Sequence, residues 1–363
     1  MKLTTLSVRH FRNMQDVTLT PCDGMNVLYG DNAHGKTNLL EAIWLLTGGK
    51  SFRGTKDADM VMFGQPKAAI DATFEAGGRR QTASVTIEQR RKATLNGVAL
   101  PAANRLTGHV CAVIFSPDHL SLIKDGPDAR RRFLDAACCQ LRPLYMKVLA
   151  DYTRTLTQRN KLIKAVKNGE QRFDDLLFDA FDERLCLSGA AVRTYRREYM
   201  EALTPYVQTM YDGLSGAREQ MTLAFNESLD AEELKAALKT ARQTDLRAGF
   251  TTVGPHRDDI DVKIGDCSAR LFGSQGQQRS AVLALKLAEG ALLAKGYHEK
   301  PLILLDDVMS ELDRSRQEYI LNHIDGFQVF ITCCDPANIE RLHGGSTFHI
   351  QNGGLKDTTG ATP

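Results

Sequence analysis

Short, mainly apolar runs occur at three places in the chain. They cover 25–29, 302–305 and 328–332. Continuous apolar runs of this length are typical of strands that are buried on both faces of a parallel sheet. Because the carboxyl ends of parallel strands meet at one edge of a sheet, the polar residues that follow these runs are expected beside one another.

Two further patterns fill the region between these runs. Apolar and polar residues alternate at 69–74, 82–88 and 93–95, and Asn96-Gly97 is a favoured hairpin turn. This alternation predicts a small antiparallel sheet. From 127 to 246, apolar and charged residues are mixed at helical spacing, which predicts a mainly helical segment.

Composition narrows the class of protein only a little. With 363 residues, 42% of them hydrophobic and 25% charged, the chain is typical of a globular protein of one or two domains. It contains no apolar run long enough for a membrane span and no secretion signal, so we expect a cytoplasmic protein that does not contact the membrane. The formal net charge of +2 means that any surface for nucleic acid must be a local patch. The eight cysteines show no C-x-x-C spacing and are expected to be reduced.

The most specific motif follows the first apolar run. Residues 30–37 read Gly-Asp-Asn-Ala-His-Gly-Lys-Thr, a complete phosphate loop that leads into a helix-like segment. In such a loop the backbone N–H groups face the phosphates, Lys36 reaches the β- and γ-phosphates, and Thr37 binds Mg²⁺. We therefore predict ATP and Mg²⁺ as cofactors. The predicted nucleotide-binding residues are Gly30, Asp31, Asn32, Ala33, His34, Gly35, Lys36, Thr37 and Asn38.

Two adjacent acids end the apolar run 302–305. We expect Asp306 to belong to the Mg²⁺ shell and Asp307 to orient and deprotonate the attacking water, because phosphoryl transfer depends on positioning and charge compensation. Taken alone, the segment is equally typical of a strand followed by a solvated acidic turn. The phosphate loop favours the catalytic interpretation, in which Lys36 and Asp307 are catalytic.

A glycine- and glutamine-rich segment, 272–279, precedes a helix-like run at 280–288. It resembles the signature motif of ABC ATPases, which contacts ATP held by a partner subunit. Ser274 precedes a helix N-terminus that is able to bind phosphate. The resemblance implies an ATP-dependent homodimer in which Ser274, as a further catalytic residue, binds ATP together with Gln275, Gly276 and Gln277. A plain turn is the alternative.

Three further positions bear on the nucleotide site. The last apolar strand ends at Thr332-Cys333-Cys334-Asp335 without the histidine of transport ATPases, so the γ-phosphate sensor is left open. The segment 113–118 lacks the usual lid glutamine, for which Asp118 or a neighbour is a candidate substitute. Arg53 resembles a head-domain arginine that approaches phosphate, although a solvated surface arginine explains it equally well.

Four stretches are similar to the RecF family of ABC/SMC-type ATPases. They are 6–13, the pair 116–120 and 126–135, 252–259, and the Ser-Gln-Gly-Gln-Gln-Arg form of the signature. Asp125 departs from the family pattern, in which a glycine is expected. The resemblance implies an α/β fold: a P-loop ABC-type head formed by 1–126 and 247–363, with a mixed sheet, flanking helices and a small antiparallel lobe. A short helical arm, 127–246, is inserted in this head.

The resemblance also implies a function. Members of this family are ATP-dependent DNA-binding proteins of recombinational repair and replication-fork maintenance, with slow, DNA-stimulated ATP hydrolysis. The implied partners are single- and double-stranded DNA at gaps or junctions, a second copy of the chain, and the RecR and RecO mediators that help to load recombinase on single-stranded DNA. An ATPase subunit of another complex and a P-loop phosphotransferase are the alternatives.

Candidate DNA contacts come from charge pattern alone. They are Arg130, Arg131 and Arg132 in one run, and Arg193, Arg196 and Arg197 at helical spacing. Basic runs of this kind are commonly just solvated. The adjacent residues 256–259, His-Arg-Asp-Asp, point in different directions and cannot bind one metal ion together, so we expect them to have a structural or interface role.

Overall fold

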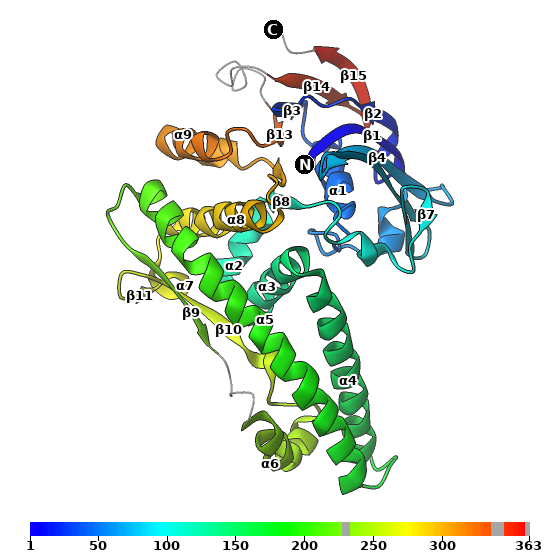
Figure 1. The fold of residues 1–363 in the computed structure, drawn as a ribbon, viewed down its shortest axis with the longest axis vertical. Helices are drawn as coiled ribbons and strands as arrows, with labels where there is room; N and C mark the ends of the chain where they lie inside the picture. The colour runs from blue at the N-terminus through cyan, green and yellow to red at the C-terminus, as the bar shows by residue number, and fades with distance from the viewer. Residues whose placement is uncertain (227–232, 335–344, 360–363) are drawn as a thin grey trace. The chain divides into compact units, whose positions relative to one another are not determined.

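The chain folds into two compact units (Figure 1). The computed structural model describes residues 1–226, 233–334 and 345–359. The first unit consists of Met1–Leu120 and Val282–Pro363, and the second of Ser121–Ala281. None of the described helices is long and apolar enough to cross a membrane.

A mainly parallel sheet forms one layer of the first unit. Its strands, in order across the sheet, are β15 (Gly354–Thr359), β14 (Ser346–Gln351), β3 (Met25–Tyr29), β13 (Val329–Cys333), β12 (Leu302–Leu305) and β8 (Ala112–Phe115). All neighbours pair in parallel except β15, which forms an antiparallel hairpin with β14. The three apolar runs are therefore β3, β12 and β13, and the predicted parallel strands are confirmed.

An antiparallel sheet forms the second layer of this unit. Its strands, in order, are β2 (Met14–Leu19), β1 (Lys2–Phe11), β4 (Ala68–Ala76), β5 (Arg79–Ile87), β6 (Arg91–Leu95) and β7 (Val98–Ala99). The three alternating segments lie in β4, β5 and β6, and Asn96 and Gly97 form the turn to β7 with φ angles of 51° and 78°. The predicted small antiparallel sheet is confirmed, and it also includes β1 and β2.

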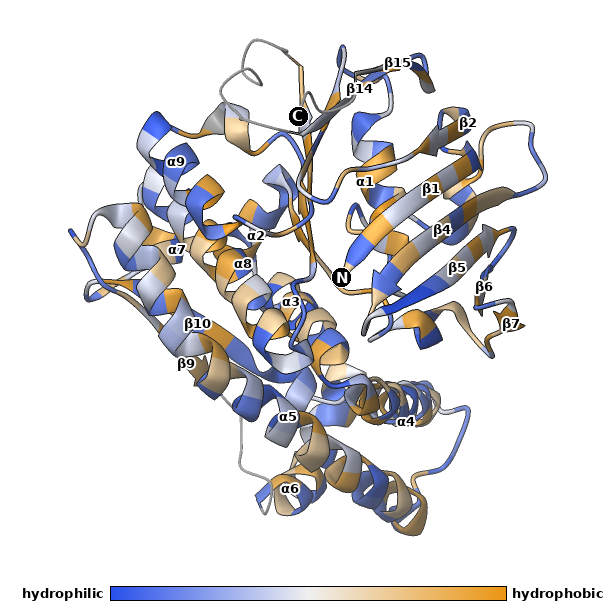
Figure 2. Cartoon of the chain, turned by 45° about the horizontal axis from the view of Figure 1, so that its top comes forward, coloured by the Kyte–Doolittle hydropathy of each residue, from blue (hydrophilic) through white to orange (hydrophobic). Residues whose placement is uncertain are grey.

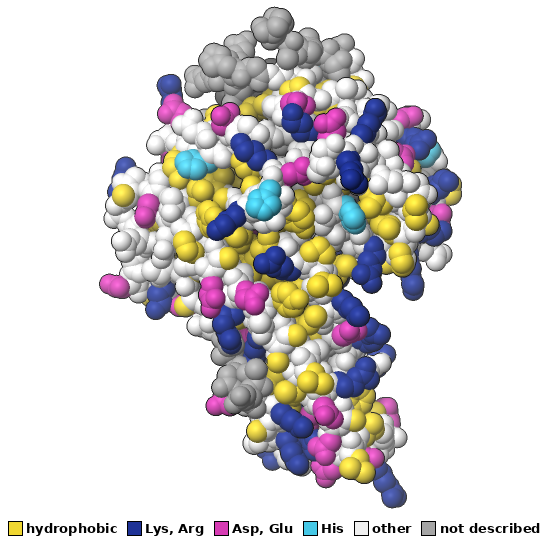
Figure 3. Space-filling view, viewed as in Figure 1, with side chains coloured by type: hydrophobic (Ala, Val, Ile, Leu, Met, Phe, Trp, Pro, Cys, Tyr) yellow, Lys and Arg dark blue, Asp and Glu magenta, His cyan; other side chains and the backbone are white. Residues whose placement is uncertain are grey.

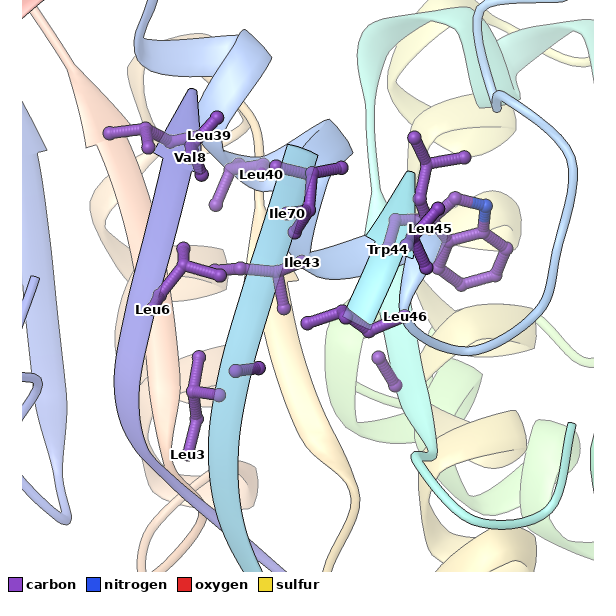
Figure 4. Close-up of a cluster of buried hydrophobic side chains, with 14 of the residues drawn as sticks. Leu3, Leu6, Val8, Leu39, Leu40, Ile43, Trp44, Leu45, Leu46 and Ile70 are labelled. Carbon is purple, nitrogen blue, oxygen red and sulfur yellow. The ribbon is translucent and has the colours of Figure 1, made fainter. Parts of the chain in front are cut away.

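The main hydrophobic core lies around the helix α1 (Lys36–Leu45). Figure 4 shows Leu6 and Val8 of β1 and Ile70 of β4 grouped with Leu40 and Ile43 of α1. All five side chains are fully buried, which is worth about 1.5–3 kcal/mol for each large aliphatic side chain. Buried residues of the parallel sheet complete the same cluster, so α1 is held between the two sheets.

A second helix, α8 (Gln275–Tyr297), packs on the parallel sheet. It begins in the second unit and continues into the first. A Cβ atom placed on its Gly290 would lie 3.6 Å from Ile303 Cδ1 of β12 and 3.8 Å from Val113 Cγ2 of β8. The absence of a side chain at Gly290 therefore lets α8 approach these strands closely. Figure 2 shows hydrophobic residues concentrated along both α1 and α8.

The second unit is built mainly from helices. They are α2 (Ser121–Lys124), α3 (Pro127–Leu141), α4 (Pro143–Lys167), α5 (Asp175–Ser215), α6 (Glu233–Ala248) and α7 (Ala269–Phe272). A three-stranded sheet accompanies them, with the order β11 (Cys267–Ser268), β10 (Asp259–Ile264) and β9 (Met221–Asn226). Short 3-10 turns and one further helix complete both units: η1 (Asp57–Met60), η2 (Ala103–Leu106), η3 (Pro117–Leu120), η4 (Pro255–Arg257), η5 (Met309–Glu311) and α9 (Arg314–His323).

The second unit is larger than the predicted arm. The segment 127–246 is helical as predicted, except that it also contains β9, which pairs with β10 in register from Asp259↔Asn226 to Ile264↔Met221. This pairing ties 259–264 to the helices, and the compact unit extends to Ala281. The division into head and arm at 126 and 246 stays a prediction.

A buried ion-pair network joins three helices of the second unit. Arg159 of α4 is fully buried; its Nε donates to Asp182 Oδ1 of α5 at 2.8 Å, and its Nη1 donates to Asp245 Oδ2 of α6 at 2.6 Å. Nη1 also donates to Thr251 Oγ1 at 2.9 Å, and Arg242 of α6 donates to the other oxygen of Asp182 at 2.7 Å. Among the described residues Asp245 thus forms an ion pair with Arg159 alone, whereas Asp182 is shared by the guanidinium groups of Arg159 and Arg242.

We predict that Arg159→Met lowers the free energy of unfolding by about 3–5 kcal/mol, because it leaves Asp245 buried without its cation and Asp182 with Arg242 alone. Urea denaturation followed by circular dichroism measures this change. The matched control is Arg154→Met on the same helix, whose partner Asp151 is solvent-accessible, and it should cost no more than about 1 kcal/mol. Equal effects of the two variants would contradict the role given to the network.

Candidate nucleotide-binding site

The loop between β3 and α1 has the backbone conformation that a phosphate loop requires. Gly30, Ala33 and Gly35 have φ angles of 142°, 65° and 108°. A Cβ atom on Gly30 would lie 2.2 Å from Ile350 O, and one on Gly35 would lie 2.7 Å from Asn13 Oδ1. Glycine is therefore needed at both positions, for its conformation and for its size. The loop leads directly into α1, whose first turn presents unpaired N–H groups.

The ammonium group of Lys36 lies inside this loop. Its side chain is buried, and Nζ donates to Gly30 O at 2.6 Å and to Asp31 O at 2.9 Å. Nζ also lies 3.6 Å from Cys334 Sγ, and this thiol donates to Asn32 Oδ1 at 2.9 Å. The ammonium group is thus fixed at the centre of the loop, where a phosphate chain would need compensation.

Thr37 and Asp306 meet at the carboxyl edge of the parallel sheet. Thr37 Oγ1 donates to Asp306 Oδ1 at 2.7 Å, and Thr332 Oγ1, at the end of β13, donates to the same oxygen at 3.0 Å. Burial raises the pKa of Asp306 above the ordinary value of 3.8, although the hydrogen bonds from Thr37 and Thr332 and the charge of Arg53 oppose this shift. The predicted proximity of the phosphate loop and the acidic strand end is therefore present.

The residues at this edge fit a magnesium ion. Mg²⁺ binds oxygen at about 2.0–2.1 Å in octahedral geometry, so neighbouring ligand oxygens lie about 2.9 Å apart. Thr37 Oγ1 and Asp306 Oδ1 are close to that separation. Among the described residues no basic side chain forms an ion pair with Asp306, so its buried carboxylate suits a cation. No cluster of three His, Cys, Asp or Glu side chains capable of binding a metal is found in the described ranges. A Mg²⁺ ion in a nucleotide site takes one or two protein carboxylates together with waters and substrate phosphates.

Asp307 leaves the strand in a left-handed conformation, with φ of 52°. Aspartate tolerates this conformation better than most residues do. Its N–H donates to Thr332 Oγ1 at 2.9 Å, and its Oδ1 accepts from Ser310 Oγ at 3.0 Å. Asp307 is exposed, and its Oδ2 accepts no hydrogen bond from a residue that the structure describes. One carboxylate oxygen is thus fixed while the other is available to a water molecule.

Asn13 supports the phosphate loop from the first hairpin. Its Nδ2 donates to Ala33 O at 3.1 Å, and its Oδ1 accepts from Asn38 Nδ2 at 2.8 Å. Arg53 Nη1 in turn donates to Asn38 Oδ1 at 2.9 Å. Arg53 is exposed, but its hydrogen bond to Asn38 connects it to the loop, which favours the interpretation of it as a residue of the site over that of a solvated arginine.

The hairpin β14–β15 supports the loop from the other end of the chain. Gly353 N donates to His34 O at 3.0 Å, and a Cβ on Gly353 would lie only 2.0 Å from Asn13 O. His349 stacks on Tyr29, with ring centroids 4.8 Å apart and an interplanar angle of 7°. Neither Asn13 nor this hairpin was predicted from the sequence, since both reach the loop only through tertiary contacts.

The signature segment lies in the second unit, at the start of α8. Ser274 Oγ accepts from Gln277 N at 3.3 Å, while Gln277 Oε1 accepts from Ser274 N at 2.7 Å. This reciprocal pair is a capping box. It occupies an acceptor lone pair of Ser274 and leaves the O–H of an exposed side chain able to donate. Gln277 Nε2 also donates to Glu219 at 2.6 Å, which anchors the segment.

Comparison with known proteins identifies the family. The model of the RecF/RecN/SMC N terminal domain matches residues 2–354. The DNA replication and repair protein RecF of Agathobacter rectalis is 37% identical over 357 residues, which cover 97% of this chain and 98% of that protein. RecF of Symbiobacterium thermophilum is 40% identical over 357 residues, with 93% of each chain covered. The chain belongs to the RecF family.

Solved structures agree with this assignment. A structure of the recombination mediator protein RecF-ATP in the RecFOR pathway has a TM-score of 0.91 and 36% identity, covering 99% of this chain and 97% of that chain. An Smc head domain of Pyrococcus furiosus has a TM-score of 0.58 at 16% identity, covering 99% and 96%, and shares the fold alone. The predicted ABC/SMC-type head is confirmed. Membership of the RecF family also confirms the predicted class of function, a DNA replication and repair protein.

Two further predicted features of the site concern the γ-phosphate sensor and the lid segment 113–118. Thr332 and Cys334 both contact site residues, whereas Asp335 lies outside the described residues. In the lid segment, Asp118 is exposed and its N–H donates to Ser116 Oγ at 3.4 Å. No described contact joins the Asp118 carboxylate to the loop, so its role as a substitute for glutamine stays a prediction.

Three of the six arginines predicted to contact DNA are buried inside the second unit. Arg130, Arg193 and Arg196 have exposed fractions of 6%, 1% and 3%. Arg130 forms a two-pronged pair with Asp259 at 2.7 and 3.0 Å, and Arg193 binds Asp258 in the same way at 3.2 and 3.0 Å. Arg196 donates to Asp135, and Arg131 donates to the carbonyl of Asp258. The DNA-contact prediction is therefore wrong for Arg130, Arg193 and Arg196, which hold the fold together; Arg132 and Arg197 are exposed.

The cluster 256–259 has a structural role, which the hydrogen bonds of His256 show. His256 Nε2 lies 2.9 Å from Thr251 O, which can only accept, so this nitrogen carries the proton. Nδ1 then accepts from Tyr152 Oη at 2.7 Å. Burial lowers the pKa of His256 to about 4, consistent with this neutral state.

We predict that Asp306→Asn raises the free energy of unfolding by about 1 kcal/mol at pH 8 in the presence of a chelator. The raised pKa of Asp306 means that its buried negative charge lowers the free energy of unfolding at high pH. As the pH falls through this pKa toward 3.8, protonation removes the same cost, so the gain should shrink. Urea denaturation at pH 8 and pH 5 measures both effects.

The control for this prediction is Asp307→Asn, which alters an exposed neighbour and should change stability by no more than about 0.5 kcal/mol. A variant at Asp306 that is less stable than the wild type at pH 8 would contradict the account of the buried carboxylate.

Proposed function

We propose that this chain is an ATP-dependent DNA-binding protein that acts at DNA gaps or junctions in recombinational repair and helps to load recombinase on single-stranded DNA. The observation that carries this proposal is the contact of Thr37 with Asp306 beside a complete phosphate loop, in a member of the RecF family. A solved RecF relative described as RecF-ATP supports ATP as the nucleotide.

ATP would bind along residues 30–38. The N–H groups of the loop and of the first turn of α1 donate to phosphate oxygens, and Lys36 compensates the charge of the β- and γ-phosphates. The contacts of Lys36 with the carbonyls of Gly30 and Asp31 keep its ammonium group in place for this exchange. Thr37 and Asp306 would hold Mg²⁺, which supplies charge compensation to the phosphates.

Asp307 would act on the attacking water. The hydrogen bond from Ser310 fixes Oδ1, so Oδ2 is able to orient the water and accept its proton as the water oxygen attacks the γ-phosphorus. The bond between this phosphorus and the β–γ bridging oxygen breaks in the same step, and ADP and phosphate are the products. The hydrolysis is proposed to be slow and to serve as a switch. A second copy of the chain would complete the site, since Ser274 is exposed at a helix N-terminus with its O–H able to donate to a γ-phosphate.

The proposed partners follow from the family. Relatives act in the RecFOR pathway, which supports RecR and RecO as partners beside double- and single-stranded DNA. A cytoplasmic location fits a DNA repair function. A phosphotransferase is disfavoured because the chain matches RecF relatives over nearly its whole length.

The test is ATP turnover with and without gapped duplex DNA. We expect DNA to raise the rate of phosphate release, and Asp307→Asn to lower it about a hundredfold while nucleotide binding is retained, because only the water-activating carboxylate is lost. Asp266→Asn, an exposed acid in the turn between β10 and β11, is the control and should leave the rate unchanged.

A rate of phosphate release that changes neither with DNA nor with the Asp307→Asn substitution would refute the proposal. Transfer of the γ-phosphate to a small molecule instead of water would favour the phosphotransferase.

A further inference from the structure

One helix of the second unit exposes charge of almost a single sign. Its six basic residues are accompanied by one acid, Asp151. Four of the basic residues lie on its outer face and are exposed: Lys147, Arg154, Lys161 and Lys164, here called the α4 basic stripe. In Figure 3, drawn in the view of Figure 1, Lys and Arg side chains recur along the edge of this unit where α4 lies.

Helical geometry places these four residues in a row. Lys147, Arg154 and Lys161 are spaced by seven residues, or nearly two turns, so they share one face and follow one another at about 10 Å intervals. Lys164 continues the row one turn later. Between them, Ala150 and Thr157 are small, so the long basic side chains stand above their surroundings.

Most of these basic side chains take no part in the contacts that hold the fold together. Lys147, Lys161 and Lys164 form no hydrogen bond or ion pair with a described residue, and Arg154 pairs only with Asp151 at 2.6 Å. The arginines Arg159, Arg193 and Arg196 are, by contrast, buried in internal ion pairs. The long helix α5 exposes many acids, among them Asp175, Asp179, Glu183, Glu198 and Glu201, so it carries no comparable row.

We propose that the α4 basic stripe contacts the phosphate backbone of double-stranded DNA. The inference rests on the proposed DNA-binding function and adds the surface that performs it. Four cations along about 25 Å of rigid helix match a polyanion of high charge density. The formal net charge of only +2 makes such a local concentration necessary for a DNA-binding chain.

The same helix lacks the groups that bind single strands. Proteins that bind single-stranded DNA stack bases on exposed aromatic side chains. Both aromatic residues of α4, Tyr145 and Tyr152, are buried, with exposed fractions of 0% and 4%. The stripe therefore offers charge without a stacking surface, which fits the backbone of a duplex and predicts binding that is independent of base sequence.

The test uses the full chain with Lys147→Gln, Lys161→Gln and Lys164→Gln combined, and duplex DNA with Mg²⁺-ATP. Fluorescence anisotropy gives the dissociation constant at several salt concentrations. Each lost phosphate contact reduces the slope of log affinity against log salt by about 0.9, so the slope should fall by about 2–3 and the affinity at low salt by about tenfold or more.

The control carries the same change of charge elsewhere in the second unit: Lys235→Gln, Lys239→Gln and Lys263→Gln, which replace exposed lysines of α6 and β10. It should keep most of the wild-type slope. Melting temperature and ATP turnover without DNA should be the same in all three proteins, which shows that the substitutions act on binding alone.

Equal slopes for the stripe and control variants, with normal wild-type binding, would overturn this inference and leave the proposed function standing; the stripe would then suit an acidic protein. A loss confined to single-stranded DNA would also overturn it. If the wild type binds no duplex at any salt concentration, both this inference and the proposed DNA-binding function fail.

Discussion

The hydrogen bond between Thr37 and Asp306 depends on the register of three parallel strands. β13 pairs with β3 from Val329↔Met25 to Cys333↔Tyr29, and with β12 up to Ile331↔Leu305. This register brings the ends of all three strands to one edge, where the phosphate loop, the acid pair and Thr332 meet. A shift of one residue would turn Asp306 to the other face of the sheet and remove the site. The core around α1 stabilises this arrangement, since the same helix carries Lys36 and Thr37.

The second unit uses its charged residues in two different ways. Inside, Arg159, Arg193 and Arg196 hold helices together through paired carboxylates, at a desolvation cost that only good geometry offsets. Outside, the α4 basic stripe keeps its charge in solvent. A chain that stays near neutral overall is thereby able to present a strongly charged surface in one place.

Sequence patterns predicted the parts of the molecule that local chemistry determines. The phosphate loop, the acidic strand end and the alternating strands were recognised because their residue types and spacing are sufficient. Asn13 and Gly353 were missed because their contacts with the loop join residues that are remote in the chain. Arg193 and Arg196 were misassigned because a sequence shows charge and helical spacing but not burial. The extent of the second unit depends on the pairing of β9 with β10, which no local pattern specifies.

We propose that ATP joins two copies of this chain through Ser274, and this step is central to the proposed switch. The most direct measurement is the mass in solution, by light scattering, of the Asp307→Asn variant with and without Mg²⁺-ATP, since slowed hydrolysis preserves the complex. The account predicts a monomer that becomes a dimer only with ATP, and loss of this dimer when Ser274→Arg is added. A mass that stays monomeric under saturating ATP would contradict it.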